Sequence, residues 1–226
     1  WALCCQPGQD IALCGKTIRS LRRNLAGPLF ERMRRMGIDC RERFSENYAD
    51  LTWGSRSVRV YLFGGRDESS ASLIQGMTLA GVLFDEVALM PRSFVEQALA
   101  RCSVEGATFW FSCNPEGPEH WFYKEWIQKA EERRALYLHF TMQDNPALSP
   151  QVIRRYERIY TGRFYERCVL GEWTAPEGQI YDMFSAERHV APAGNRDWQR
   201  LVISCDYGTV NPMSMGLWGR WDGVWH

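Results

Sequence analysis

The sequence has no excess of charge of either sign, since 27 lysines and arginines are balanced by 27 aspartates and glutamates. The net charge therefore gives no indication of a nucleic-acid partner. None of the eight cysteines is spaced as CxxC, and His120, His139 and His189 have no partner at helical ligand spacing. We therefore expect no disulfide framework, no zinc site and no metal bound through histidine. Cys14, Cys113 and Cys205 lie in apolar stretches and are expected to be buried thiols.

Long apolar runs, low-complexity segments and internal repeats are also missing. Because we find neither a run of membrane-spanning length nor a signal peptide, we expect a cytoplasmic protein with no membrane partner. The hydrophobic content is 45%, which over 226 residues is enough for one substantial core. Residues 16–43 hold nine lysines and arginines but three aspartates and glutamates. This local excess fits a solvated helix face at least as well as a DNA-binding surface.

Strand-like and helix-like patterns alternate over residues 1–143. Gly27-Pro28 is expected to kink the first long helix, and Ser93 to cap the second. This alternation predicts an α/β fold with a mainly parallel sheet covered by helices. The predicted strands are 11–16, a hairpin within 51–65, 81–84, 107–115 and 135–142, and the predicted helices are 18–36, 92–102 and 119–134.

The pattern changes after residue 143. Ser149-Pro150 is a good helix start, and Thr161-Gly162 separates two short helical stretches. The last segment then contains an apolar strand, a turn, a second strand and the beginning of a third. The predicted organisation is an α/β domain at 1–143, a helical linker region at 144–196 and the first strands of another domain at 197–226.

The stretch IALCGKTIRS places a glycine, a lysine and a threonine between a strand and a helix, as a phosphate loop does. A phosphate loop needs the spacing GxxxxGK[ST], which lets several backbone N–H groups point at the phosphates. Asp10 stands where the first glycine is required, and Ile11–Cys14 are apolar. We therefore interpret the stretch as a strand that ends in Lys16 and Thr17, and not as a nucleotide cradle.

The stretch GVLFDEVA carries the strongest local signal of chemistry. Gly81–Phe84 are expected to form a buried strand, and Asp85 and Glu86 follow at its carboxyl end, where ligands bind in open α/β sheets. In ATPases an aspartate at this point holds the water shell of Mg²⁺, and the next glutamate accepts a proton from the water that attacks the γ-phosphate. A strand that simply ends in a polar pair explains this stretch about equally well.

Two further strands also end in polar side chains. FWFSCNPEGPEHWFYKEW places Ser112 and Asn114 after a strand expected to lie beside Asp85 and Glu86, where an amide can sense the γ-phosphate; alone, Asn-Pro is more typical of a local turn. LVISCDYGT places Asp206 after an apolar first strand, as in the two-magnesium sites of RNase H-class nucleases. Actin-like ATPases begin similarly, and a surface aspartate before a turn is more frequent than either.

Taken in order, these stretches resemble the large terminase subunit of tailed bacteriophages. SASLIQGMTLAGVLFDEVALMP resembles its Walker B region, and FWFSCNPEGPEHWFYKEW its coupling motif with the helix that follows. HFTMQDNPALSPQVIRRYERIYTGRFYERCVLGEW resembles the segment that leads into its linker, and VISCDYGTVNPMSMGLW the first hairpin of its nuclease. The resemblance covers nearly the whole chain, and the order of the four motifs is more specific than any one of them.

The resemblance implies a P-loop NTPase-type sheet, a small helical linker and the start of an RNase H-like nuclease domain, with ATP and Mg²⁺ as cofactors. The phosphate loop would precede Trp1 and the later nuclease acids are not in the sequence, so a fragment with two incomplete active sites is expected. The implied roles are Asp85 as the Mg²⁺-associated acid, Glu86 as the catalytic base, Ser112 and Asn114 as ATP-coupling residues, and Asp206 as the first nuclease metal ligand.

The implied activity is ATP-driven translocation of double-stranded DNA into a procapsid, with metal-dependent cleavage of concatemeric DNA. The expected partners are double-stranded DNA, the small terminase subunit and the portal protein, with a homo-oligomeric ring on the portal in the host cytoplasm. Two alternatives stay open. One is a helicase-like ATPase without a nuclease, in which Asp206 lies in an ordinary hairpin, and the other is a non-catalytic remnant or a DNA- or partner-binding module.

Overall fold

The strand predicted at residues 11–16 lies in the interior of a six-stranded sheet. The computed structural model describes residues 2–4, 9–174, 189–190, 192, 196–207 and 213–226. The strands of this sheet are β1 (Asp10–Gly15), β2 (Asp39–Arg43), β3 (Tyr48–Trp53), β4 (Arg56–Gly64), β5 (Leu79–Phe84) and β6 (Thr108–Phe111). Their order across the sheet is β2-β3-β4-β1-β5-β6.

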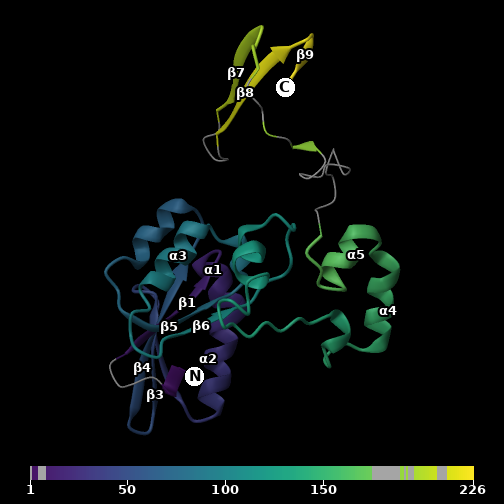
Figure 1. The fold of residues 1–226 in the computed structure, drawn as a ribbon. Helices are drawn as coiled ribbons and strands as arrows, with labels where there is room; N and C mark the ends of the chain where they lie inside the picture. Colours follow the sequence, from purple (N-terminus) through teal and green to yellow (C-terminus); the bar gives the residue numbers. More distant parts are fainter. Residues whose placement is uncertain (1, 5–8, 175–188, 191, 193–195, 208–212) are drawn as a thin grey trace. The chain divides into compact units, whose positions relative to one another are not determined.

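Strands β4, β1, β5 and β6 run parallel, whereas β2 and β3 pair antiparallel at one side of the sheet (Figure 1). The predicted α/β class with a mainly parallel sheet is therefore confirmed. The predicted hairpin is also present, because Trp53 of β3 pairs with Arg56 of β4 across the turn. The parallel strands have their carboxyl ends at the same end of the sheet. The residues that directly follow these strands are therefore brought together there.

The apolar residues of β1 alternate between two hydrophobic cores, because successive side chains of a strand point to opposite faces. Ile11 and Leu13 pack with the helical run after β1, which consists of α1 (Ile18–Leu21), the π-helical η2 (Arg22–Ala26) and α2 (Gly27–Arg35). Ala12 and Cys14 pack with Phe94, Val95 and Ala98 of α3 (Arg92–Ala100). Both faces of the sheet are thus covered where the site residues emerge.

Short helical turns connect these elements. They are η1 (Ala2–Cys4), η3 (Glu68–Ile74), η4 (Val87–Leu89), the π-helical η5 (Tyr123–Ile127) and η6 (Met142–Asp144).

Several local predictions differ from the structure. Gly27-Pro28 does not interrupt the helical run, because Pro28 occupies an early position of α2, where its missing N–H is not needed, and the irregularity is the π-helix before it. Ser93 is not a cap, since α3 is preceded by Pro91 and the Ser93 hydroxyl donates to Glu68. Strand β2 was not predicted, because Cys40 is its single buried residue and the pattern is too weak.

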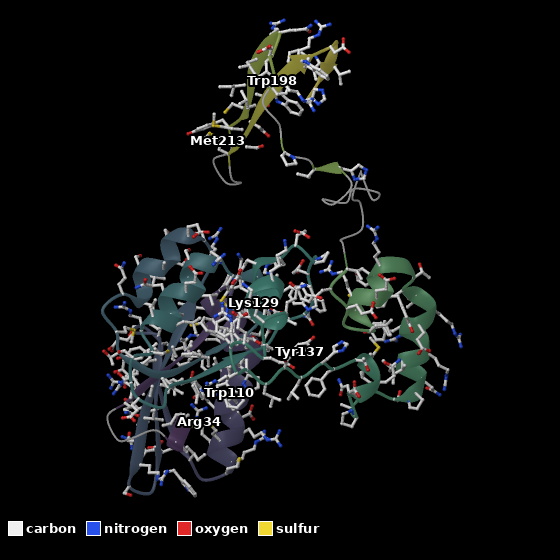
Figure 2. All side chains as sticks on the ribbon, in the orientation of Figure 1. Arg34, Trp110, Lys129, Tyr137, Trp198 and Met213 are labelled. Carbon is white, nitrogen blue, oxygen red and sulfur yellow. The ribbon has the colours of Figure 1, made fainter. Side chains whose placement is uncertain are left out.

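The stretch after β6 also departs from the prediction. Residues 107–115 are not a buried strand, because β6 is the last strand in the order, with 40% of Phe109 and 51% of Trp110 exposed. Trp110 is labelled in Figure 2. Of the helix expected over 119–134, residues 121–122 and η5 are helical, and residues 128–134 form turns. Residues 135–142 are not a strand, since a strand needs a hydrogen-bonded neighbour and none pairs with them in the described part of the chain.

The chain divides into two compact units, Trp1–Gly178 and Gln179–His226. The two helices predicted around Thr161-Gly162 are α4 (Pro150–Ile159) and α5 (Gly162–Cys168), and Ser149 caps α4 by accepting from the Val152 N–H. The second unit holds an antiparallel sheet of β7 (Arg200–Asp206), β8 (Ser214–Trp221) and β9 (Val224–Trp225).

The expectation of buried thiols holds in part. Cys14 and Cys40 are buried and Cys113 is half-buried, whereas Cys205 is exposed because β7 has no covering layer in the described residues of its unit. No helix in the described ranges is both long and apolar enough to cross a bilayer.

Candidate functional site

The carboxyl ends of β5 and β6 are joined through Ser112. Its hydroxyl donates to Asp85 Oδ1 (3.1 Å) and accepts from the Glu86 backbone N–H (3.4 Å). The Ser112 backbone continues the connection, because its N–H donates to the Phe84 carbonyl (2.9 Å) and its carbonyl accepts from the Val87 N–H (2.9 Å). The structure therefore brings together Asp85, Glu86 and Ser112 at one edge of the sheet.

Glu86 has a left-handed backbone, with φ 58° and ψ 52°. This conformation is uncommon for a residue with a Cβ, and costs about 1 kcal/mol or more. It turns the chain sharply from β5 into η4 and leaves Glu86 half-buried. Strained residues of this kind gather at functional sites, where the surrounding structure holds them in place. The sequence contains no signal for this conformation.

Asn114 lies two residues beyond Ser112 and is exposed. Its side chain makes no hydrogen bond to another residue in the described part of the chain. The Ser112 hydroxyl, by contrast, is hydrogen-bonded to both Asp85 and Glu86.

Lys16 and Thr17, which follow β1 at the same edge, have local partners. Lys16 Nζ donates to the Arg66 carbonyl (2.8 Å), and the Thr17 hydroxyl accepts from the Ser20 N–H (3.1 Å) as the cap of α1. Gly64 at the end of β4 packs closely here, since a Cβ on it would lie 2.9 Å from the Ile18 nitrogen. The lysine and the threonine thus hold the end of the strand to its neighbours.

The basic segment 16–43 is partly neutralised in the structure. Arg22 and Arg34 pair with Glu42, at 3.6 and 2.8 Å. Arg35 pairs with Glu31 and Arg41 with Asp39. These contacts favour the solvated-face interpretation of the segment over a continuous basic surface.

Asp206 belongs to the second unit, where it ends β7 and pairs with Ser214 of β8. It is exposed. Within the described ranges, no group of three or more histidines, cysteines, aspartates and glutamates is placed to hold a metal ion.

His120 is a residue that the sequence reasoning did not place near the site. Its Nδ1 accepts from the Phe122 N–H (3.2 Å), so the ring proton sits on Nε2, and the backbone of Ala88 in η4 lies near the ring. Burial lowers the pKa of His120, against smaller opposing effects of the Ala88 backbone and Glu116. The ring is therefore expected to be neutral where it lies near the turn that follows Glu86.

The lowered pKa of His120 predicts a specific sensitivity to acid. The unfolded chain binds a proton at His120 near the usual pKa of about 6.5, whereas the folded protein binds it only at lower pH. The stabilisation is therefore complete above about pH 6.5 and is lost as the pH falls through the folded pKa. By calorimetry, the Tm should fall between about pH 7 and 5, and fall less in His120→Gln. The exposed His226→Gln is the control, and equal slopes in all three proteins would contradict the prediction.

The sequence also matches a known family. Residues 4–188 match the family described as "Terminase large subunit, T4likevirus-type, N-terminal". The chain belongs to the terminase large-subunit family. No curated protein matches it.

Solved terminase structures resemble the whole chain. The large terminase of a thermophilic bacteriophage in complex with ADP is 49% identical, with a TM-score of 0.76, over 100% of this chain and 56% of that one. A second crystal form of the same phage protein is 52% identical, with a TM-score of 0.75, over 100% of this chain and 55% of that one. This terminase chain thus spans little more than half the length of the thermophilic phage protein.

The ATPase domain of the Thermus phage P74-26 large terminase is similar in fold. It is 12% identical, with a TM-score of 0.53, over 75% of this chain and 78% of that one. The mainly parallel sheet of this terminase chain therefore has the same fold as that domain.

Proposed function

We propose that this chain is part of a longer terminase large subunit that couples ATP hydrolysis to translocation of double-stranded DNA into a procapsid and cleaves concatemeric DNA. The observation that carries the proposal is the Asp85–Ser112–Glu86 network at the carboxyl edge of a parallel sheet. It is supported by the terminase of the thermophilic bacteriophage, whose structures include complexes with ADP and with ATP-γ-S. The longer polypeptide is called the full-length protein below.

Glu86 is proposed as the general base. A carboxylate held at the carboxyl end of β5 can accept a proton from the water that attacks the γ-phosphate, provided that water lies within hydrogen-bond reach. The backbone of Glu86 is held by the hydrogen bond from its N–H to Ser112 and by its left-handed conformation, which together fix the direction of the Cα–Cβ bond. Asn114, which is exposed two residues after Ser112, is proposed to sense the γ-phosphate together with Ser112.

Asp85 is proposed to hold Mg²⁺ through water. The donor chemistry fits, because Mg²⁺ in nucleotide sites is bound by one or two carboxylates, several waters and the phosphates. The hydrogen bond from Ser112 orients the Asp85 carboxylate. When bound, the ion would neutralise charge on the phosphates, while Asp85 supplies a fixed anchor for its water shell.

The phosphate loop is proposed to come from sequence outside residues 1–226. β6 is the last strand in the order, so one of its two long sides has no neighbouring strand in the described residues, and its residues Phe109 and Trp110 are 40% and 51% exposed. Open edges of this kind accept a further strand. If the strand that carries the phosphate loop paired with β6 in parallel, its carboxyl end would lie at the same end of the sheet as Asp85, Ser112 and Asn114. The phosphates need to lie there.

The remaining segments complete the proposal. Residues 1–143 form a partial ATPase domain, 144–196 a helical linker region and 197–226 the first strands of an RNase H-like nuclease, with Asp206 as the first metal ligand. The proposed partners are double-stranded DNA, the small terminase subunit and the portal protein, on which the full-length protein assembles as a ring in the host cytoplasm.

The test compares residues 1–226 with the full-length protein. The full-length protein should hydrolyse ATP, whereas residues 1–226 should release phosphate at the background rate, because nothing holds the γ-phosphate in line with Glu86. Circular dichroism would establish that the shorter chain is folded. Lys16→Ala in the full-length protein should leave turnover unchanged. Robust turnover by residues 1–226 that Lys16→Ala removes would overturn the placement of the phosphate loop.

A further inference from the structure

Arg167 in the last turn of α5 holds the loop that follows β6. Its Nε and Nη2 both donate to the Pro115 carbonyl, at 3.1 and 2.9 Å. Nη2 also lies 3.2 Å from Glu116 Oε2, and 24% of the Arg167 side chain is exposed. The planar guanidinium can make all three contacts at once. It therefore orients the Pro115 carbonyl through paired hydrogen bonds and also forms an ion pair with Glu116.

This contact fixes the second end of a loop whose first end belongs to the candidate site. Ser112 is tied to Asp85 and Glu86, and Pro115 is tied to Arg167. Asn114 lies between these two anchors and directly precedes the bonded Pro115. The position of its amide relative to Glu86 therefore depends on both.

The segment around Arg167 is held in place by hydrogen bonds, burial and ring stacking. The Val169 carbonyl accepts from the Met142 N–H (3.0 Å), and 1% of Val169 is exposed. The Leu170 carbonyl is hydrogen-bonded to His139 Nε2 (2.9 Å), and the Trp173 ring stacks on Tyr123 with 5.0 Å between centroids. Arg167 thus projects from a turn that is fixed to the rest of its unit and is not a loose surface arginine.

We propose that Arg167 is a positioning residue that sets Asn114 at the nucleotide edge and makes the α4–α5 segment responsive to the state of that edge. The inference rests on the proposed ATPase function and on the role of Asn114 in it. Arg167 does not touch the nucleotide in this proposal. It acts through the Pro115 carbonyl, so its loss should impair the chemical step and leave ATP binding intact.

The experiment measures kcat and KM for ATP in the full-length protein carrying Arg167→Met, Asn114→Ala or both. Each single variant should lower kcat by about 10- to 100-fold, because a small displacement of a positioned group has effects of that size. KM should stay within about twofold. If Arg167 acts through Asn114, the double variant should be no slower than the slower single variant. Arg158→Met, on the exposed face of α4, is the matched control and should keep full turnover.

Arg167→Lys keeps the positive charge but not the paired donors to Pro115, and should have an intermediate kcat with unchanged KM. It also keeps the test decisive if the methionine variant does not fold. Wild-type kcat in the lysine variant, or multiplied losses in the double variant, would overturn the inference. The unsubstituted full-length protein is run alongside: if it does not hydrolyse ATP, the proposed function itself fails, whereas normal turnover in both the unsubstituted protein and the Arg167 variants rejects the positioning role alone.

Discussion

Glutamine at position 86 of the full-length protein is expected to lower ATP turnover by at least about 100-fold, since a general base contributes a rate factor of that order. The substitution keeps the size of the side chain and the left-handed backbone of Glu86, and removes the ability to accept a proton. ATP binding should persist, because Glu86 is proposed to act on the attacking water and not on the phosphates. Phosphate release measures the first effect, and binding of a fluorescent ATP analogue the second.

Glu105→Gln provides the matched control. This glutamate is exposed in the connection between α3 and β6, so its substitution makes the same chemical change away from the edge. It should leave kcat and KM unchanged. Turnover that survives in Glu86→Gln, with a normal Glu105→Gln, would show that the proton goes elsewhere and would remove Glu86 from the proposed mechanism.

Alanine at position 206 should separate the two proposed activities. Cleavage of DNA by the full-length protein should fall by more than about 100-fold, because a metal ion supplies several kcal/mol of transition-state stabilisation that depends on its ligands. ATP turnover should remain, since Asp206 belongs to a different compact unit from Asp85 and Glu86. Conversion of supercoiled to linear plasmid in Mg²⁺ and phosphate release from ATP would be measured on the same preparation.

Asp197→Ala is the control for this variant, because it removes an exposed carboxylate shortly before β7 without changing the strand that Asp206 ends. Loss of both activities in Asp206→Ala would mark Asp206 as structural. Unchanged cleavage would leave Asp206 in an ordinary β7–β8 hairpin with no part in the reaction, and absence of cleavage by the unsubstituted full-length protein would favour a helicase-like ATPase without a nuclease.

The elements that the sequence predicts well are those whose signal is local. The run from Leu79 to Phe84 is apolar and short, so it forms a strand wherever it can be covered on both faces. The β3–β4 hairpin needs only its turn and alternating residues. Ser149-Pro150 likewise sets the start of α4 within a few residues. In each case the deciding interactions lie within one or two neighbouring segments.

The features that escape prediction depend on distant partners. Residues 135–142 have the apolar pattern of a strand, yet pattern alone cannot provide a neighbouring strand. Arg167 and Pro115 are 52 residues apart in the sequence, and neither residue type predicts a contact between them. The site residues Asp85, Glu86 and Ser112 were found because strand ends share an edge, whereas the proximity of His120 to the turn at Ala88 required the folded chain.

The left-handed turn at Glu86 has a consequence for attempts to make this terminase more robust. Glycine adopts this backbone without the penalty that glutamate carries, so Glu86→Gly would relieve strain of about 1 kcal/mol while removing the carboxylate. A screen that rewards heat resistance alone would therefore tend to enrich inactive proteins at this position. Raising the stability of the fold while keeping the proposed ATPase activity requires selection for ATP turnover at the same time.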